Sequence, residues 1–137
     1  TDTSFTAKKL KVKDQGIPDE QQIKARQGDV VARLRIALSQ LSHYSAPFRR
    51  DAIISVGKAV KDLEPGELVG QLAQIVAGMA KMIIDADESV RQAGLPVWTF
   101  LFRDIDRRSW MPFLPNIVAF LILGLTHISL DIRVDTC

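Results

Sequence analysis

The chain has 137 residues, of which 47% are apolar and 25% charged, and its formal net charge is +2. This is the size of one ordinary domain with a globular composition, which argues against a multidomain enzyme and against disorder over the whole length. The charge is uneven, since residues 1–50 carry ten Lys and Arg against five Asp and Glu. Basic character is therefore concentrated near the N-terminus.

Residues 1–28 show no sustained apolar period and hold two glycines and a proline, so we interpret them as an extended basic N-terminal arm. Lysines in it alternate with apolar residues. Such a segment either is a solvated tail or lays apolar side chains on a partner while its lysines meet acidic protein or RNA phosphate. The candidate partner-binding residues are Phe5, Lys8, Lys9, Lys11 and Lys13.

Helical periodicity begins after Asp29, a candidate N-cap. A first helix is predicted from Val30 to about Ser42, and a second from Ser45 to about Leu63. These two helices form a predicted first repeat over residues 29–64.

Glu64-Pro65-Gly66 then interrupts the pattern. A third helix is predicted over Glu67–Ile84 and a fourth over Glu88–Arg103, followed by a charged loop at 104–109. This second repeat spans residues 65–109.

A fifth helix is predicted from about Pro112 to His127, and a sixth opens after Ser129 in a truncated repeat, 110–137. Because the chain starts without Met and stops inside this sixth helix, we expect it to be a fragment of a longer protein. The apolar run Phe113–Leu130 is broken by Pro115, Asn116 and His127, so we interpret it as a buried helix rather than a membrane span.

An internal repeat organises the chain. Three apolar–Arg pairs recur at intervals of 42 residues: Phe48-Arg49, Val90-Arg91 and Ile132-Arg133. A residue type that caps helices, Ser45, Asp87 or Ser129, stands three positions before each pair's apolar member. Together with apolar residues at helical spacing, this predicts an all-α solenoid of HEAT or armadillo type, with about two and a half repeats of 42 residues.

The repeat also bears on chemistry. His43, Asp85 and His127 occupy one repeat position, which favours a structural role at the turns over a nucleophile–base pair. We expect the three repeated arginines to join neighbouring repeats through turn carbonyls or an acid such as Asp87, rather than to form a phosphate-binding ladder. No catalytic residues, metal site or cofactor motif emerge, and we predict a protein that is not an enzyme.

Several segments resemble the family of testis-expressed protein 10 and its fungal counterpart, a pre-rRNA-processing protein named for the second internal transcribed spacer. They are Thr1-Asp2-Thr3-Ser4-Phe5-Thr6-Ala7-Lys8, Leu38-Ser39-Gln40-Leu41-Ser42-His43-Tyr44-Ser45, Asp85-Ala86-Asp87-Glu88-Ser89-Val90-Arg91, Pro112-Phe113 and Thr126-His127-Ile128. The resemblance implies a scaffold subunit of the nuclear Rix complex, found in nucleolus and nucleoplasm. That complex acts on precursors of the large ribosomal subunit.

The resemblance further implies a helical-repeat partner, a WD-repeat protein, the pre-60S particle and the AAA-type ATPase midasin as partners, with RNA contacted indirectly and no membrane. Two alternatives remain open from the residues themselves. One is a helical-repeat adaptor for another intracellular assembly, such as nuclear transport or cytoskeletal machinery. The other is a direct RNA-binding module that acts through the basic arm.

Overall fold

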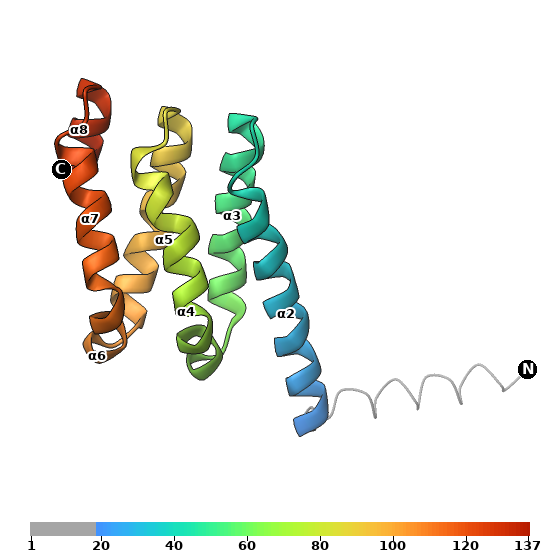
Figure 1. Ribbon diagram of the computed structural model, residues 1–137. Coiled ribbons are helices and arrows are strands. Elements are labelled where there is room, and N and C mark those ends of the chain that lie inside the picture. Colours follow the sequence, from blue (N-terminus) through green and yellow to red (C-terminus); the bar gives the residue numbers. More distant parts are fainter. Residues whose placement is uncertain (1–18) are drawn as a thin grey trace, which may run out of the picture.

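The computed structural model describes residues 19–137, and all regular structure in this range is helical (Figure 1). The longer helices are α2 (Glu20–Gln40), α3 (Ala46–Asp62), α4 (Pro65–Met79), α5 (Glu88–Asp104), α7 (Leu114–Leu125) and α8 (Leu130–Thr136). Three short helices connect them: η1 (Ala80–Ile84), α6 (Arg107–Trp110) and η2 (Met111–Phe113). The predicted all-α class is confirmed for the described residues, whereas the arm residues before Asp19 lie outside them.

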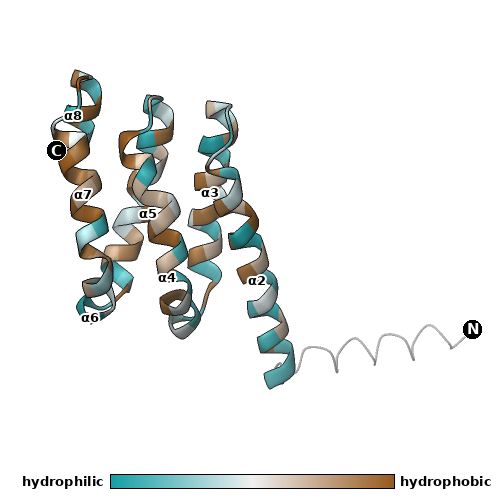
Figure 2. Cartoon of the chain, in the orientation of Figure 1, coloured by the Kyte–Doolittle hydropathy of each residue, from teal (hydrophilic) through white to brown (hydrophobic). Residues whose placement is uncertain are grey.

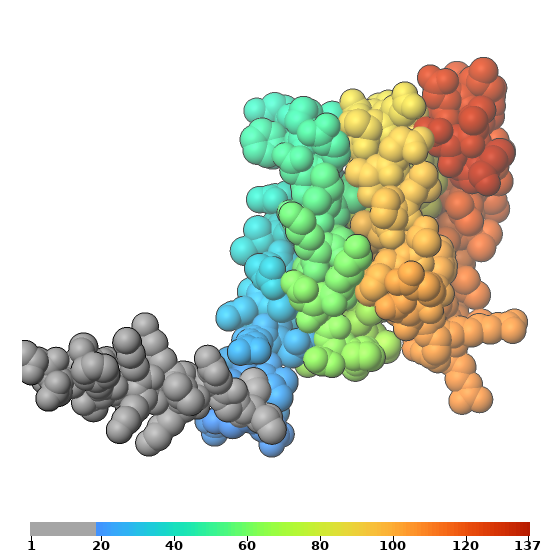
Figure 3. All heavy atoms as spheres, turned by 180° about the vertical axis from the view of Figure 1, so that it is seen from behind, coloured from blue at the N-terminus to red at the C-terminus, as the bar shows by residue number. Residues whose placement is uncertain are grey.

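The helices form three antiparallel hairpins that stand side by side (Figure 1): α2 with α3, α4–η1 with α5, and α7 with α8. Helices α2, α4 and α7 lie in one layer, and α3, α5 and α8 lie in the other, which faces the viewer in Figure 3. The turns inside the three hairpins all lie at the same end of the molecule, the upper end in Figure 1. Equivalent residues of the 42-residue period are thereby placed along one edge.

The first helix starts earlier than the sequence predicts. Helix α2 begins at Glu20, so the prediction that residues 20–28 belong to an extended arm is wrong, as is the N-cap at Asp29. The cap is Asp19, whose carboxylate accepts a hydrogen bond of 2.8 Å from the backbone N–H of Gln22. A side-chain oxygen at this position satisfies a backbone donor that has no partner inside the helix.

This added segment of α2 is anchored to the next turn through one side chain. The amide group of Gln27 accepts a hydrogen bond of 2.9 Å from the Glu64 backbone N–H and donates one of 3.3 Å to the Asp62 carbonyl. The segment before Val30 is otherwise mostly exposed, and its Glu, Gln, Lys and Arg residues favour helix by propensity alone. It has no apolar stripe by which periodicity could detect it.

The stretch between the second and third hairpins also differs from its prediction. Residues 107–110 form the short helix α6 where a charged loop was expected over 104–109. Trp110 at its end is buried and belongs to the main core, while Trp98 packs partly buried against that core. Both tryptophans therefore contribute to packing of the core.

The core runs through all three hairpins. Its largest fully buried side chains are Leu34, Ile53, Leu72, Ile75, Met79 and Leu101. The two ends of the row differ in polarity: α2 is largely hydrophilic along its first half, whereas α7 is strongly hydrophobic (Figure 2). The third hairpin exposes many large apolar side chains, namely Leu114, Val118, Leu121, Ile122, Leu123, Leu125, Ile128, Leu130 and Val134.

Two helical stretches are long and apolar enough to cross a membrane by length and composition: Pro65–Ile84 and Arg107–Leu125. In the folded chain, Pro65–Ile84 contributes Leu72, Ile75 and Met79 to the core. The other stretch is divided among α6, η2 and α7. The length criterion is a weak one, since a core helix of a globular protein meets it equally well.

Glycine is required where α7 meets α8. A Cβ atom on Gly124 would run into the side chain of Thr136, whereas one on Gly70 in α4 would meet open space. We expect Gly124→Ala to lower the free energy of unfolding by about 1–3 kcal/mol, because the overpacked side chains force the helices apart. In the matched control, Gly70→Ala should be neutral or stabilising by up to about 1 kcal/mol, since alanine favours an exposed helix. Urea unfolding of both variants tests this, and equal effects would contradict it.

Candidate functional site

The three hairpin turns share one local structure. At each turn, a side chain accepts a hydrogen bond from the backbone N–H two residues later. His43 Nδ1 accepts from Ser45 at 3.0 Å, and His127 Nδ1 accepts from Ser129 at 3.0 Å. An oxygen of Asp85 accepts from Asp87 in the same way, at 2.9 Å. The repeat position of the two histidines and Asp85 therefore has the structural role predicted from the sequence.

The predicted capping residues stand where the second helix of each hairpin begins. Ser45, Asp87 and Ser129 are the N-cap residues of α3, α5 and α8, each with extended backbone. Only the carboxylate of Asp87 makes the side-chain cap bond, accepting from the N–H groups of Ser89 at 2.8 Å and Val90 at 3.3 Å. At Ser45 and Ser129 the cap position is kept while the serine hydroxyls make no such bond.

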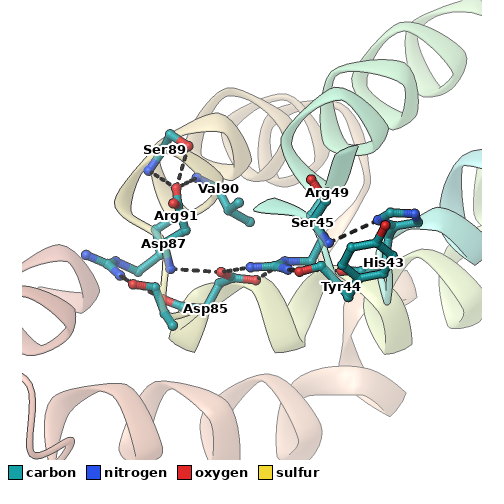
Figure 4. Close-up of polar contacts among 10 residues, drawn as sticks. His43, Tyr44, Ser45, Arg49, Asp85, Asp87, Ser89, Val90 and Arg91 are labelled. Atoms are coloured by element: carbon teal, nitrogen blue, oxygen red, sulfur yellow. Dashed lines mark hydrogen bonds and ion pairs between the residues drawn. The ribbon is translucent and has the colours of Figure 1, made fainter. Parts of the chain in front are cut away.

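Each repeated arginine binds the turn of its own hairpin (Figure 4 shows the first two). Arg49 Nη1 donates to the carbonyls of His43 at 2.9 Å and Tyr44 at 3.0 Å. In the second hairpin, Arg91 Nη1 donates to the carbonyls of Asp85 at 2.7 Å and Ala86 at 3.3 Å. Arg133 Nη1 makes the same bonds in the third hairpin, donating to the carbonyls of His127 at 2.7 Å and Ile128 at 3.2 Å.

Two of the arginines also bind the following hairpin. The Nε and Nη2 atoms of Arg49 donate to the two oxygens of Asp85, at 2.9 and 3.0 Å (Figure 4). Arg91 Nε donates to Asp135 in α8 at 2.8 Å. The acid that pairs with Arg49 is thus Asp85, not Asp87, and the acid that pairs with Arg91 comes from a helix. These contacts join neighbouring hairpins, as the interpretation favoured from the sequence requires.

Hydrogen bonding to carboxylates sets the electrostatics of these pairs. The hydrogen bonds to Asp85 raise the pKa of Arg49 above its ordinary value, so the guanidinium stays charged at any working pH. The Arg91 side chain is 4% exposed and its partner Asp135 is 19% exposed. Arg49 and Arg91 are each bound to a carboxylate and to two turn carbonyls, which favours a structural role over phosphate binding.

An exposed aromatic cluster lies beside the first turn. The ring of His43 stacks on Tyr44 at a centroid distance of 4.5 Å and lies 4.6 Å from the ring of Phe48. Tyr44 is 91% exposed and Phe48 60% exposed. Clustered aromatic side chains that are exposed are typical of protein-contact surfaces.

A small apolar cavity of about 180 Å³ lies between the second and third hairpins. Trp98, Phe102, Leu95 and Leu121 line it, with the Arg91–Asp135 pair at its edge. This cavity could not be predicted from the sequence, because its walls come from helices that only the tertiary fold brings together. Within residues 19–137, no three His, Cys, Asp or Glu side chains are grouped as metal ligands.

No protein-family model matches the chain. The chain is similar to the testis-expressed protein 10 homolog of Danio rerio, with 27% identity over 92 residues. The match covers 67% of this chain but only 10% of that much longer protein. The resemblance inferred from the sequence motifs is thus found again as a distant similarity between the two proteins.

One predicted pH effect arises at the second turn. The hydroxyl of Ser89 hydrogen-bonds to Asp87, and this, aided by the backbone N–H groups of α5, lowers the pKa of Asp87 below its ordinary value. The carboxylate therefore stabilises the fold above the pKa of an unfolded aspartate, and this contribution is lost as the pH falls through the lowered value. We expect the stability of Asp87→Asn to fall less steeply on acidification, because asparagine also caps helices but does not titrate.

Urea unfolding from neutral pH to below the pKa of an unfolded aspartate measures this difference. Asp106→Asn provides a second test of the same sign, since the Ser109 hydroxyl lowers the pKa of Asp106 in the same way. Parallel pH profiles for both variants and the unmodified chain would contradict the assignment.

Proposed function

We propose that the chain is a scaffold without catalytic activity, built as a HEAT or armadillo-like solenoid, in a nuclear assembly of the Rix type. In this role it takes part in maturation of the large-subunit precursor, including processing of the second internal transcribed spacer. The observation that carries the proposal is the similarity to a testis-expressed protein 10 homolog. The three hairpins in one register support the solenoid architecture.

The surface of the described residues suits a binding role. Catalysis needs polar groups that converge in a cavity, but the cavity here is largely apolar, and its two charged residues, Arg91 and Asp135, are already paired with each other. Exposed aromatic and aliphatic side chains instead lie at the first turn and over the third hairpin. Large exposed apolar surface is a mark of protein–protein contact.

A pull-down from nuclear extract tests the proposal. The tagged chain should recover large-subunit precursor RNA that retains the spacer, together with a WD-repeat protein and a second helical-repeat protein. Recovery of transport or cytoskeletal proteins without precursor RNA would favour the adaptor function and overturn the ribosomal one. Tyr44→Ala with Phe48→Ala, which removes the exposed aromatic cluster, should reduce recovery if the first turn is a contact.

Direct RNA binding is the second candidate function, favoured by the excess of ten basic over five acidic residues in positions 1–50. It predicts that changing Lys8, Lys9, Lys11 and Lys13 to Glu abolishes binding of the isolated chain to a spacer RNA. Binding of the unmodified chain should then weaken steeply with salt, because each phosphate contact releases a counterion. Filter binding at several salt concentrations measures both effects.

The chain offers a control with the same change of net charge. Lys24, Lys58, Lys61 and Lys81 are exposed on helices, and changing these four to Glu should leave RNA binding in place if the arm supplies it. Equal losses in both quadruple variants would show a general charge effect instead. No RNA binding by the unmodified chain would leave RNA contact to the partner proteins, as the scaffold function expects.

A further inference from the structure

The third hairpin exposes side chains whose counterparts in the first two hairpins are buried or partly buried. Along one repeat position, Leu34 is 0% exposed and Val76 1% exposed, but Val118 is 47% exposed. At another position, Leu41 is 2% exposed while Leu125 is 46% exposed. The chain itself therefore shows what covers such positions: the first two hairpins each have another hairpin packed on this side, while within the described residues the third has none.

Arg133 shows the same contrast in its hydrogen bonds. Its Nη1 atom is bound to turn carbonyls just as that of Arg49 is, which fixes the guanidinium in an equivalent position. The Nε and Nη2 atoms of Arg49 hold Asp85 of the next hairpin. Within residues 19–137, the same two atoms of Arg133 bind no acceptor and no carboxylate lies within ion-pair distance.

From these two observations we infer that the exposed face of α7 and α8 binds a further helical hairpin that presents a carboxylate to Arg133. The carboxylate comes from the turn of that hairpin, as Asp85 does, or from its second helix, as Asp135 does. The hairpin buries the apolar stripe of Val118, Ile122 and Leu125. This inference goes beyond the proposed function and holds for whichever assembly contains the chain.

A second copy of the chain fits this face less well. The helix at its opposite end, α2, exposes Lys24, Arg26, Arg33 and Arg35 and has only three buried residues. Docking such a helix would bury its charged side chains against an apolar surface, which is costly.

The inference can be tested with the chain's own second hairpin as the probe. Residues 54–106 are appended directly after Cys137, so that each appended residue lies two 42-residue intervals after its original. Arg49 also lies two 42-residue intervals before Arg133. The appended copy of Asp85 is therefore placed relative to Arg133 as Asp85 is placed relative to Arg49. Native-state hydrogen exchange is then compared between the original and the extended chain, with sedimentation to establish that both are monomers.

We expect amide protection in α7 and α8 to rise about tenfold or more on extension, because local opening then breaks the added contacts. Arg133→Asp alone, or Asp85→Arg in the appended copy alone, should lower the gain about tenfold, and the two changes together should restore it. Unchanged protection in α7 and α8 on extension would overturn the inference. So would single variants that behave like the unmodified extended chain.

One further outcome identifies a different occupant. If the original chain dimerises and Asp51→Arg abolishes the dimer, a second copy covers the face. Asp51 is the acid that such a copy would offer, because it lies two 42-residue intervals before Asp135 and so occupies the same position of the repeat. That result overturns the inference in favour of self-association. None of these outcomes depends on the nuclear pull-down, so failure here and failure of the proposed function are distinguishable.

Discussion

Replacing Arg91 with alanine should lower the free energy of unfolding by about 3–5 kcal/mol, because it leaves a partly buried carboxylate and two turn carbonyls without their donor. The side chain of Arg91 is 4% exposed, donates to Asp135 at 2.8 Å and also satisfies the Asp85 and Ala86 carbonyls. All three acceptors lose their donor at once. Urea unfolding monitored by circular dichroism measures the change.

Two further variants separate the ion pair from the general loss of a side chain. Arg103→Ala removes an arginine that is 71% exposed and paired only with the adjacent Asp104, so a change below about 0.5 kcal/mol is expected. Adding Asp135→Ala to Arg91→Ala should recover part of the stability, because no unpaired charge then remains. A double variant less stable than Arg91→Ala would show that Asp135 contributes independently of the pair.

The positions of the helices could largely be predicted from the sequence. Helices α3, α5 and α8 begin after Ser45, Asp87 and Ser129 as expected, since a capping residue followed by an apolar period marks a helix start in the sequence itself. The start of α2 was missed because its first ten residues are held by propensity and by the Asp19 cap rather than by an apolar face. A prediction that relies on apolar periodicity cannot detect a helix that has no buried face.

The candidate site was predictable only in part, for a related reason. The 42-residue period identified the arginines and placed them on one edge, because equivalent residues of stacked hairpins occupy equivalent positions. It could not identify the acids, since Asp85 and Asp135 occupy different repeat positions. The pairing is set by which carboxylate reaches the guanidinium in space, and the third turn carries His127 where the second carries Asp85.

The number of neighbours that each hairpin has determines how stability is distributed along the row of hairpins. The second hairpin has neighbours on both sides, whereas in the described residues the third has one neighbour and exposes most of α7. Local opening should therefore begin at α7 and α8, where few buried contacts are lost. Truncation of a buried side chain in the middle of the row should instead destabilise the whole fold.

Leu72→Ala should consequently destabilise the entire fold by about 3–5 kcal/mol. Leu72 lies on α4 in the central hairpin, is 0% exposed and belongs to the continuous core, so its truncation removes apolar contacts and leaves a cavity that close-packed neighbours cannot fill. Val69→Ala on the same helix is the matched control, because Val69 is 42% exposed and a change below about 1 kcal/mol is expected. Hydrogen exchange distinguishes a global effect from a local one: amides in α3, α4 and α5 should lose protection together in Leu72→Ala. Loss confined to α4 would show that the hairpins unfold independently and that the row is not a single cooperative unit.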